Sequence, residues 1–201
     1  MAPPVNPSIS RKLNIVLNPF QTKDGLAYVH SIPVGRQTFE MCFRPMARAM
    51  SAIVSEGIGP ITGPSIAALL LQQEANLIGE GDAISQTLIP EIKRLTNVII
   101  AGSGAVMPYG VAEQRNLLDD EQRSEIENLL VFFTLVSWIK LPEGLSSGLG
   151  LEGLRQLWKV QTTSLEPTAF MSSLKTSTKD ANTGAKTPTP DTAANPSSIA
   201  A

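Results

Sequence analysis

One long stretch of this chain would be apolar on every side of a helix, and this limits how the chain can fold. Among residues 129–139, only a threonine and a serine are polar. We predict a helix over residues 119–140, because Asp119 and Gln122 have the spacing of a capping box at its start. A helix without a polar face is buried or lies in an interface. Other elements of the chain, or a partner, therefore have to surround it.

The N-terminal part of the sequence shows the two-residue alternation of β-strands. Residues 12–18 place their large apolar side chains on one face, and Asp24-Gly25 favours a tight turn before a second strand over residues 26–32. Residues 36–44 alternate again, so we predict a third strand there. A sheet this small is not stable alone and has to place its apolar face on helices.

After Pro45 the pattern becomes helical. We predict helices over residues 46–56, 65–78, 83–100 and 119–140, a short helix over 151–160, and a last helix that begins at Ser164 or Pro167. Ser65 is a suitable N-cap and Gly79 a suitable end signal for the second of these helices. We expect residues 57–64 and 102–110, which are rich in glycine and proline, to be irregular.

These patterns together predict a single α+β domain, mostly helical, with a small N-terminal antiparallel β-sheet. We place the domain at residues 12–175, β-rich over 12–45 and helical over 46–175, after an extended arm at residues 1–11. Residues 176–201 are mostly Ser, Thr, Ala, Pro and Asn. Such a segment cannot bury enough apolar surface to offset the entropy lost on ordering, so we predict a disordered polar tail.

Composition argues against several classes of protein. The 201 residues include 16 Lys and Arg and 18 Asp and Glu, without a basic run, which argues against binding to a nucleic-acid backbone. Charged residues make up 17%, below the usual value of about 25%, which favours a surface that meets other proteins. Cys42 is the single cysteine, so the chain forms no internal disulfide. We expect neither a signal peptide nor a membrane helix.

One glycine motif superficially resembles a dinucleotide-binding fingerprint. An apolar run leads into Gly102-Ser103-Gly104, but Met107 stands where the third glycine is needed. Pro108 would also block the helix whose N-terminus binds the pyrophosphate. We therefore interpret the motif as a helix end followed by a glycine turn, and we expect no cofactor.

His30 and Cys42 are the residues on which catalysis would have to depend. His30 lies in a predicted strand, and the sequence suggests no partner that would make it a general base. Cys42 lies beside Glu40 and Arg44 on the face of another predicted strand, where a half-buried, unreactive thiol is the ordinary case. One histidine and one cysteine exclude zinc sites built on these residues. We predict a protein that is not an enzyme, with a hydrolase using His30 or Cys42 as a competing hypothesis.

Acidic residues gather at the start of the helix predicted for residues 119–140. They are Asp119, Asp120, Glu121, Glu125 and Glu127. Paired carboxylates can bind a metal or transfer protons. Their favourable interaction with the helix dipole explains their position without either role. We therefore expect no metal site here.

Two segments resemble the tail assembly chaperones of long-tailed bacteriophages. Residues 113–134, EQRNLLDDEQRSEIENLLVFFT, are similar to a helix of that family that has an acidic start and ends in L/V-x-F-F-T. Residues 158–178, followed by the polar tail, are similar to the C-terminal part of these chaperones. The order of strands before a helical body is also similar.

The resemblance implies a small, mainly helical protein without enzymatic activity. Members of the family keep the apolar tape measure protein soluble in the cytoplasm of the infected host and help to recruit tail tube subunits. They are absent from the finished particle, and a ribosomal frameshift often adds a second domain to some copies. A structural protein of the virion, such as a tail terminator, head–tail connector or minor tail subunit, is the alternative.

Apolar blocks at residues 66–71, 98–101 and 129–139 are candidates for the surface that binds a partner or a second copy of the chain. A helical core is the other explanation for them. From their crowding on all-apolar helix segments, we predict partner-binding residues at Leu69, Leu70, Leu129, Phe132, Phe133 and Trp138.

Overall fold

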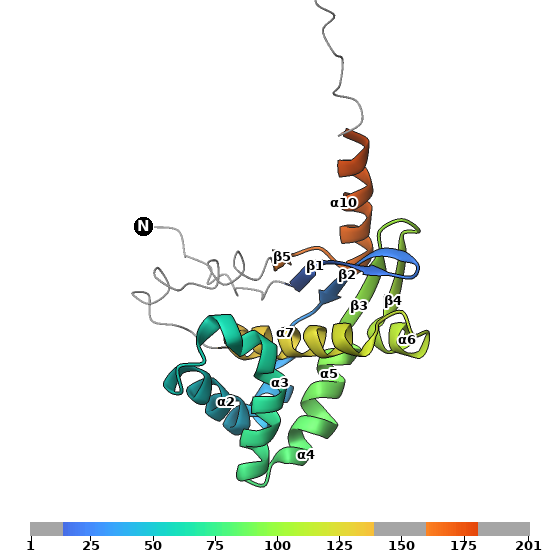
Figure 1. The fold of residues 1–201 in the computed structure, drawn as a ribbon. Coiled ribbons are helices and arrows are strands. Elements are labelled where there is room, and N and C mark those ends of the chain that lie inside the picture. The colour runs from blue at the N-terminus through green and yellow to red at the C-terminus, as the bar shows by residue number, and fades with distance from the viewer. Residues whose placement is uncertain (1–13, 139–159, 181–201) are drawn as a thin grey trace, which may run out of the picture.

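A computed structural model describes residues 14–138 and 160–180 of the chain. The predicted α+β class is confirmed: one antiparallel sheet lies between a helical body and a C-terminal helix (Figure 1). The predicted arm, residues 1–11, lies outside the described residues. So do most of the helix predicted for residues 151–160 and most of the tail predicted for residues 176–201.

The sheet has five strands in the described part of the chain, in the order β4-β3-β2-β1-β5. Their bounds are Asn14–Thr22 (β1), Gly25–Ser31 (β2), Thr96–Ile100 (β3), Ala105–Pro108 (β4) and Gln161–Thr163 (β5). Strands β1 and β2 form the predicted hairpin, and Gly25 in its turn has a φ of 114°, which favours glycine. The sheet is larger than predicted, because three of its strands come from later parts of the sequence.

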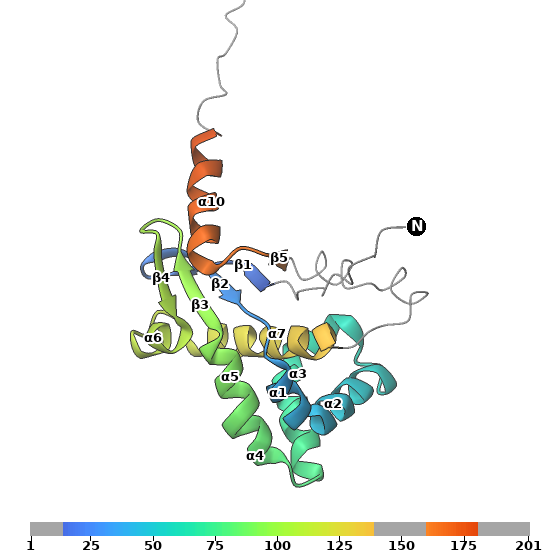
Figure 2. The ribbon, with the colours of Figure 1, turned by 180° about the vertical axis from the view of Figure 1, so that it is seen from behind.

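The helices other than α10 form a layer on one side of this sheet, and α10 lies on the other side (Figures 1 and 2). Their bounds are Arg36–Met41 (α1), Phe43–Ser55 (α2), Gly59–Leu77 (α3), Gly81–Ala83 (α4), Ile89–Arg94 (α5), Tyr109–Gln114 (α6), Asp120–Trp138 (α7) and Pro167–Asp180 (α10), with a π-helical segment at Ile84–Leu88. Helix α3 ends just before Gly79, as predicted, and that glycine has a φ of 74°.

Helix α7 begins with the predicted capping box. The main-chain N–H of Gln122 donates to Oδ1 of Asp119 over 2.8 Å, and the N–H of Asp119 donates to Oε1 of Gln122 over 3.2 Å. These two bonds satisfy N–H groups that the helix itself leaves unpaired. The sequence therefore located the start of this helix correctly.

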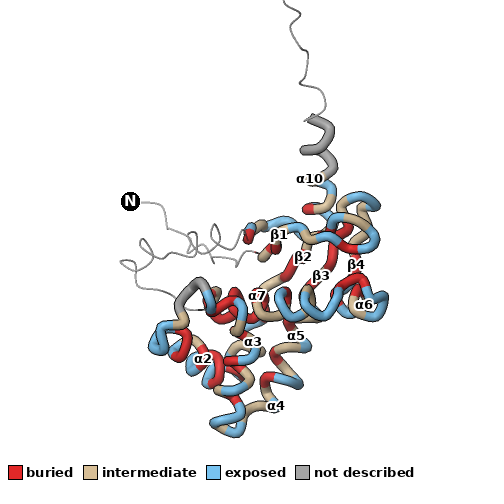
Figure 3. Tube along the Cα trace, in the orientation of Figure 1, coloured by how far each residue is buried: buried red, intermediate tan, exposed pale blue. Residues whose placement is uncertain are grey.

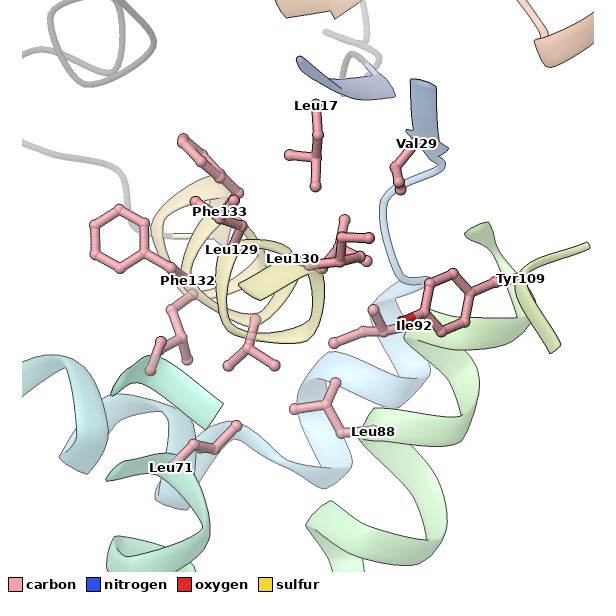
Figure 4. Packing of buried hydrophobic residues seen from close by; sticks show 14 of the residues in the cluster. Leu17, Val29, Leu71, Leu88, Ile92, Tyr109, Leu129, Leu130, Phe132 and Phe133 are labelled. Atoms are coloured by element: carbon pink, nitrogen blue, oxygen red, sulfur yellow. The ribbon is translucent and has the colours of Figure 1, made fainter. Parts of the chain in front are cut away.

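Helix α7 lies at the centre of the core. Every residue from 129 to 136 is buried (Figure 3). Their side chains leave the helix in different directions, with Phe133 toward Leu17 of the sheet and Leu130 toward Ile92 and Tyr109 of the helical layer (Figure 4). The helix has no polar face in this region because it is enclosed by the sheet on one side and by helices on the other.

The far face of the sheet carries a smaller apolar cluster. Val16 and Ile99 lie there, packed against Phe170 of α10. The rings of Phe170 and Tyr28 meet edge to face, with their centroids 5.9 Å apart. Helix α10 continues to Asp180, beyond residue 176, where we expected the tail to begin.

Residues 36–44 are helical, so the strand predicted there is wrong. They form α1 and the start of α2, joined at Cys42. Phe39 and Phe43 are four residues apart, a spacing that places side chains on one face in a helix as well as in a strand. The alternation therefore could not distinguish the two structures.

The irregular segment predicted for residues 57–64 is also mostly helix, because α3 begins at Gly59. Ser65, the predicted N-cap, therefore lies inside the helix, and that prediction is wrong. Pro60 lies in the first turn of the helix, where its missing N–H has no partner to lose, whereas Pro64 lies inside the helix. Gly63 allows a close approach between helices: a Cβ there would lie 3.2 Å from Cγ2 of Ile53 and from Cε2 of Phe132. This glycine serves packing and does not break the helix.

The single helix predicted for residues 83–100 ends at Arg94, and Thr96–Ile100 is strand β3. A short apolar run can be helix or strand, and periodicity alone does not decide between them. The loop predicted for residues 102–110 contains β4 and the start of α6. Gly104, with a φ of 68°, closes the hairpin by donating its N–H to the carbonyl oxygen of Ile100. The glycine motif therefore lies in an antiparallel hairpin, which contradicts the dinucleotide fingerprint. The glycine turn is confirmed, but the helix end predicted before it is wrong, because a strand leads into the turn.

Candidate functional site

An apolar groove runs along α2 on the surface of the helical body. Its volume is about 490 Å³. It is lined by Phe39 of α1, by Leu135 of α7 and by seven residues of α2: Phe43, Met46, Ala47, Met50, Ser51, Val54 and Ser55. We call it the α2 groove.

Helix α2 has apolar residues on two faces. One face belongs to the core and contains Pro45, Met46, Ala49, Ala52 and Ile53. The second face contains Phe43, Ala47, Met50 and Val54, whose spacings of four, three and four residues align them along the helix. Phe43 is 52% exposed and Val54 is 69% exposed. A helix at the edge of a domain needs one apolar face for folding, so the second face is available for another purpose.

The floor of the α2 groove is part of the core, whereas its wall is exposed. Leu135 and Met46 are buried, and they support the groove from below. The ring of Phe39 lies edge-on to that of Phe43 at one end, with their centroids 5.6 Å apart. Met50 adds an unbranched, polarisable side chain, which adapts to apolar surfaces of different shape. The groove thus combines a fixed base with an adaptable rim.

Ion pairs connect α2 with α3 and with the turn that follows α3, beside the groove. Nη1 of Arg44 lies 2.8 Å from Oε1 of Glu80, and Nε of Arg48 lies 2.8 Å from Oε2 of Glu74. The two pairs show that the helices run antiparallel, since the earlier arginine meets the later glutamate. They leave polar side chains along one border of the apolar stripe.

The residues predicted to bind a partner lie mostly in the core. Leu70, Leu129, Phe132 and Phe133 are buried, with Phe132 only 1% exposed. They cannot contact a partner unless the fold opens. Their crowding in the sequence reflects the packing of α7 and α3 in the core. Leu69 is 59% exposed, on the outer side of α3. Trp138 is the last residue of α7, and its side chain lies outside the described part of the structure.

His30 holds the C-terminal segment against the sheet. It is fully buried in β2, and its Nε2 lies 3.0 Å from the carbonyl oxygen of Leu165. The same oxygen accepts a hydrogen bond from Nδ2 of Asn14 over 2.9 Å. Burial lowers the pKa of His30, against the raising effects of its hydrogen bonds and of Glu166. The imidazole is therefore neutral at pH 7 and links β5 and α10 to β1 and β2.

Cys42 lies at the junction of α1 and α2 and not on a strand. Its side chain is buried, and Sγ donates to the carbonyl oxygen of Ala83 at 3.5 Å. Burial raises the pKa of this thiol, and the negative charge of Glu80 raises it further. A raised pKa lowers the thiolate fraction on which nucleophilic attack depends.

The acidic residues near the start of α7 have separate structural contacts. Asp119 caps the helix, and Asp120 pairs with Arg123. Glu121 and Glu125 are exposed. No group of three or more His, Cys, Asp or Glu side chains in the described ranges is arranged to hold a metal ion.

Glu127, the last of these acidic residues, belongs to a charged cluster that joins three helices. Nζ of Lys93 in α5 lies 2.5 Å from Oε1 of Glu127 in α7 and 3.2 Å from Oε1 of Glu113 in α6. Burial opposes the charge of Lys93, but the two carboxylates outweigh it and raise the pKa. The cluster fixes the relative positions of the helices.

The α2 groove was not among the predicted sites. Residues 36–44 were assigned to a strand, so Phe39 and Phe43 were not connected with the helix that follows. A signal was present: Phe43, Ala47, Met50 and Val54 form a helical stripe in addition to the stripe that the core uses. An excess of apolar residues on a short helix indicates a second contact surface.

Comparison with models of known protein families, with curated proteins and with solved structures finds no match to this chain. None of the helices within residues 14–138 and 160–180 is long and apolar enough to cross a membrane.

Proposed function

We propose that this chain is an assembly chaperone without enzymatic activity, which keeps an apolar tape measure protein of a long-tailed phage soluble and helps to recruit tail tube subunits. The resemblance of residues 113–134 and 158–178 to tail assembly chaperones suggests the partners. The α2 groove supports the proposal by offering a place where an apolar helix can bind.

The exposed apolar stripe of α2 is the observation that carries the proposal. A chaperone of this kind has to cover apolar helix surface that would otherwise aggregate. A helix that lies in a hydrophobic groove makes its contacts through residues three and four positions apart. Phe43, Ala47, Met50 and Val54 have the matching arrangement.

The test is co-expression of the full chain with a tape measure protein, followed by size-exclusion chromatography of the soluble fraction. We expect a soluble complex with the unaltered chain. Val54→Glu should abolish the complex, because it introduces a charge into the apolar stripe. The matched control is Leu77→Glu: Leu77 is 72% exposed on α3 and does not line the groove. The control should leave the complex intact.

The same experiment distinguishes the competing functions. If the chain fails to solubilise the tape measure protein and instead assembles into rings or tubes, it is a structural subunit, and it should then be found in purified particles. If Leu77→Glu and Val54→Glu have equal effects on the complex, the groove is not the contact surface. Circular dichroism of both variants checks that each remains folded.

A further inference from the structure

We propose that the α2 groove selects helices whose apolar stripe is bordered by carboxylates, and that Arg44 and Arg48 recognise them. The inference rests on the proposed function, since it specifies the chemistry of the helix that the groove binds. Two adjacent stripes on α2 carry it: the apolar one already described and a polar one beside it.

The polar stripe repeats the spacing of the apolar one. Arg44, Arg48, Ser51 and Ser55 are separated by four, three and four residues, so they run parallel to the apolar stripe and one position after it. Ser51 and Ser55 line the groove themselves, which places this stripe on its border. A helix lying in the groove therefore has its own border residues next to the two arginines.

The arginines are more exposed than the glutamates that hold them. The side chain of Arg44 is 72% exposed against 26% for Glu80, and that of Arg48 is 50% exposed against 14% for Glu74. Each guanidinium makes one close contact with its glutamate, and a guanidinium has five N–H donors. Donors thus remain on the solvent side, positioned by the ion pairs, where a carboxylate of a partner can accept two parallel hydrogen bonds.

The opposite border of the apolar stripe cannot provide a similar contact. Met46 and Ile53 lie on that side of α2, and both are buried in the core. On α2, charged side chains therefore border the apolar stripe on one side only. Carboxylates are the groups that match this side.

A second copy of the chain fits the groove less well than a helix with acidic borders. Two copies of α2 packed antiparallel about a two-fold axis would place the polar stripe of one copy against the same stripe of the other. That stripe contains arginine and serine and offers no carboxylate to Arg44 or Arg48. A different protein whose helix carries carboxylates would place negative charge, and not a second set of arginines, beside Arg44 and Arg48.

The experiment compares three synthetic helices that differ only in their border residues. Because α2 has 13 residues and is about 20 Å long, peptides of about 18 residues cover it fully. Each carries leucines at alternating spacings of three and four, with Glu, Gln or Lys at the positions beside the stripe. Fluorescence anisotropy with the full chain then gives the three dissociation constants.

We expect the Glu-bordered peptide to bind about three- to tenfold more tightly than the Gln-bordered one, and the Lys-bordered peptide to bind most weakly. The preference should fall when salt is raised to about 1 M, where charges are screened within about 3 Å. The double variant Arg44→Gln, Arg48→Gln should lose the preference for the Glu-bordered peptide, and the Lys-bordered peptide should no longer bind most weakly, because Glu80 and Glu74 keep their charges. Replacing both arginines with lysine should retain part of the preference, since the charge remains.

Arg94→Gln is the matched control, because Arg94 also pairs with a glutamate but lies on α5. It should leave the order of affinities unchanged. Equal binding of the three peptides by the unaltered chain would overturn the inference while leaving the groove as a helix site. Binding of none of them, as expected if a second copy or another segment of this chain fills the groove, would also overturn it. If the chain still solubilises the tape measure protein in either case, the proposed function stands without the charge preference. If the peptides bind in the expected order but the tape measure protein stays insoluble, the charge preference stands and the proposed function does not.

Discussion

The ring of Phe39 in α1 stands edge-on to the ring of Phe43 in α2, with the ring planes inclined at 72°. This contact closes one end of the α2 groove and connects the two helices across the turn at Cys42. Phe43 remains half exposed, so this pair of rings also forms part of the protein surface. Because the ring is exposed, a small hydrophobic dye can test whether the groove is open in solution, without a biological partner.

The double variant Phe43→Ser, Val54→Ser should reduce binding of a hydrophobic fluorescent dye to the native protein. Both side chains are largely exposed, so we expect a loss of no more than about 1 kcal/mol in the free energy of unfolding. Dye titration and urea unfolding measure the two quantities. Unchanged dye binding would mean that the groove is covered in solution.

Gly63→Ala should destabilise the protein by about 1–2 kcal/mol. The added methyl group would meet Ile53 and Phe132 at 3.2 Å, and both are buried, so the cost of overpacking exceeds the gain in helix propensity. Gly110→Ala in α6 is the control: no atom lies within 4 Å of its Cβ position, and we expect a gain of about 0.5–1 kcal/mol. Urea unfolding of the two variants should therefore give opposite signs.

Phe132→Ala should cost about 3–5 kcal/mol, whereas Leu69→Ala should change the free energy of unfolding by less than about 0.5 kcal/mol. Phe132 is enclosed by the core and Leu69 is exposed, although the apolar crowding in the sequence predicts one binding surface for both. Chemical denaturation compares them. A small effect of Phe132→Ala would show that α7 is not at the centre of the core.

Asp119→Ala should cost about 1 kcal/mol, because the N–H of Gln122 loses its acceptor at the start of α7. Asp120→Ala is a useful comparison, since it keeps the cap and removes only an exposed pair with Arg123. Thermal unfolding followed by circular dichroism should rank the first variant clearly below the second. Equal melting temperatures would exclude a stabilising role of the capping box.

The free energy of unfolding should decrease as the pH falls below 6.5. Burial lowers the pKa of His30 in the folded state, so the unfolded chain binds the proton more readily. The stability that neutral His30 contributes is complete above the pKa of about 6.5 in the unfolded chain, and it is lost as the pH falls toward the lower pKa of the folded state. The free energy of unfolding changes by at most about 1.4 kcal/mol per pH unit in this range. The chain has a single histidine, so His30→Gln should flatten this region of the profile. Urea unfolding between pH 7.5 and 5 measures the slope, and a slope that persists in the variant would assign it to other groups.

Elements defined by local chemistry were predictable. The capping box at Asp119, the turn at Gly25 and the helix end before Gly79 depend on residues close in sequence, and all three are confirmed. Segments whose structure depends on distant partners were not. Residues 96–100 form a strand because β2 offers its edge, and Gly63 lies in a helix because α2 and α7 approach it there.

The same distinction applies to the candidate site. Apolar crowding in residues 129–139 correctly indicated a helix without a polar face, but crowding alone did not distinguish core from interface. The stripe of α2 is less apolar than α7 along the sequence, yet it is the one left open: Val54 and Phe43 remain more than half exposed, although Phe39 contacts one edge of Phe43.

The α+β class, the first hairpin and the ends of several helices could be predicted from the sequence, since turns, caps and periodicity depend on interactions over a few residues. The tertiary structure decided the rest: that β3, β4 and β5 complete the sheet, that α7 is core, and that α2 presents a second apolar face. Whether an apolar side chain is buried depends on which elements, distant in sequence, supply its neighbours, and only the folded arrangement of those elements provides them.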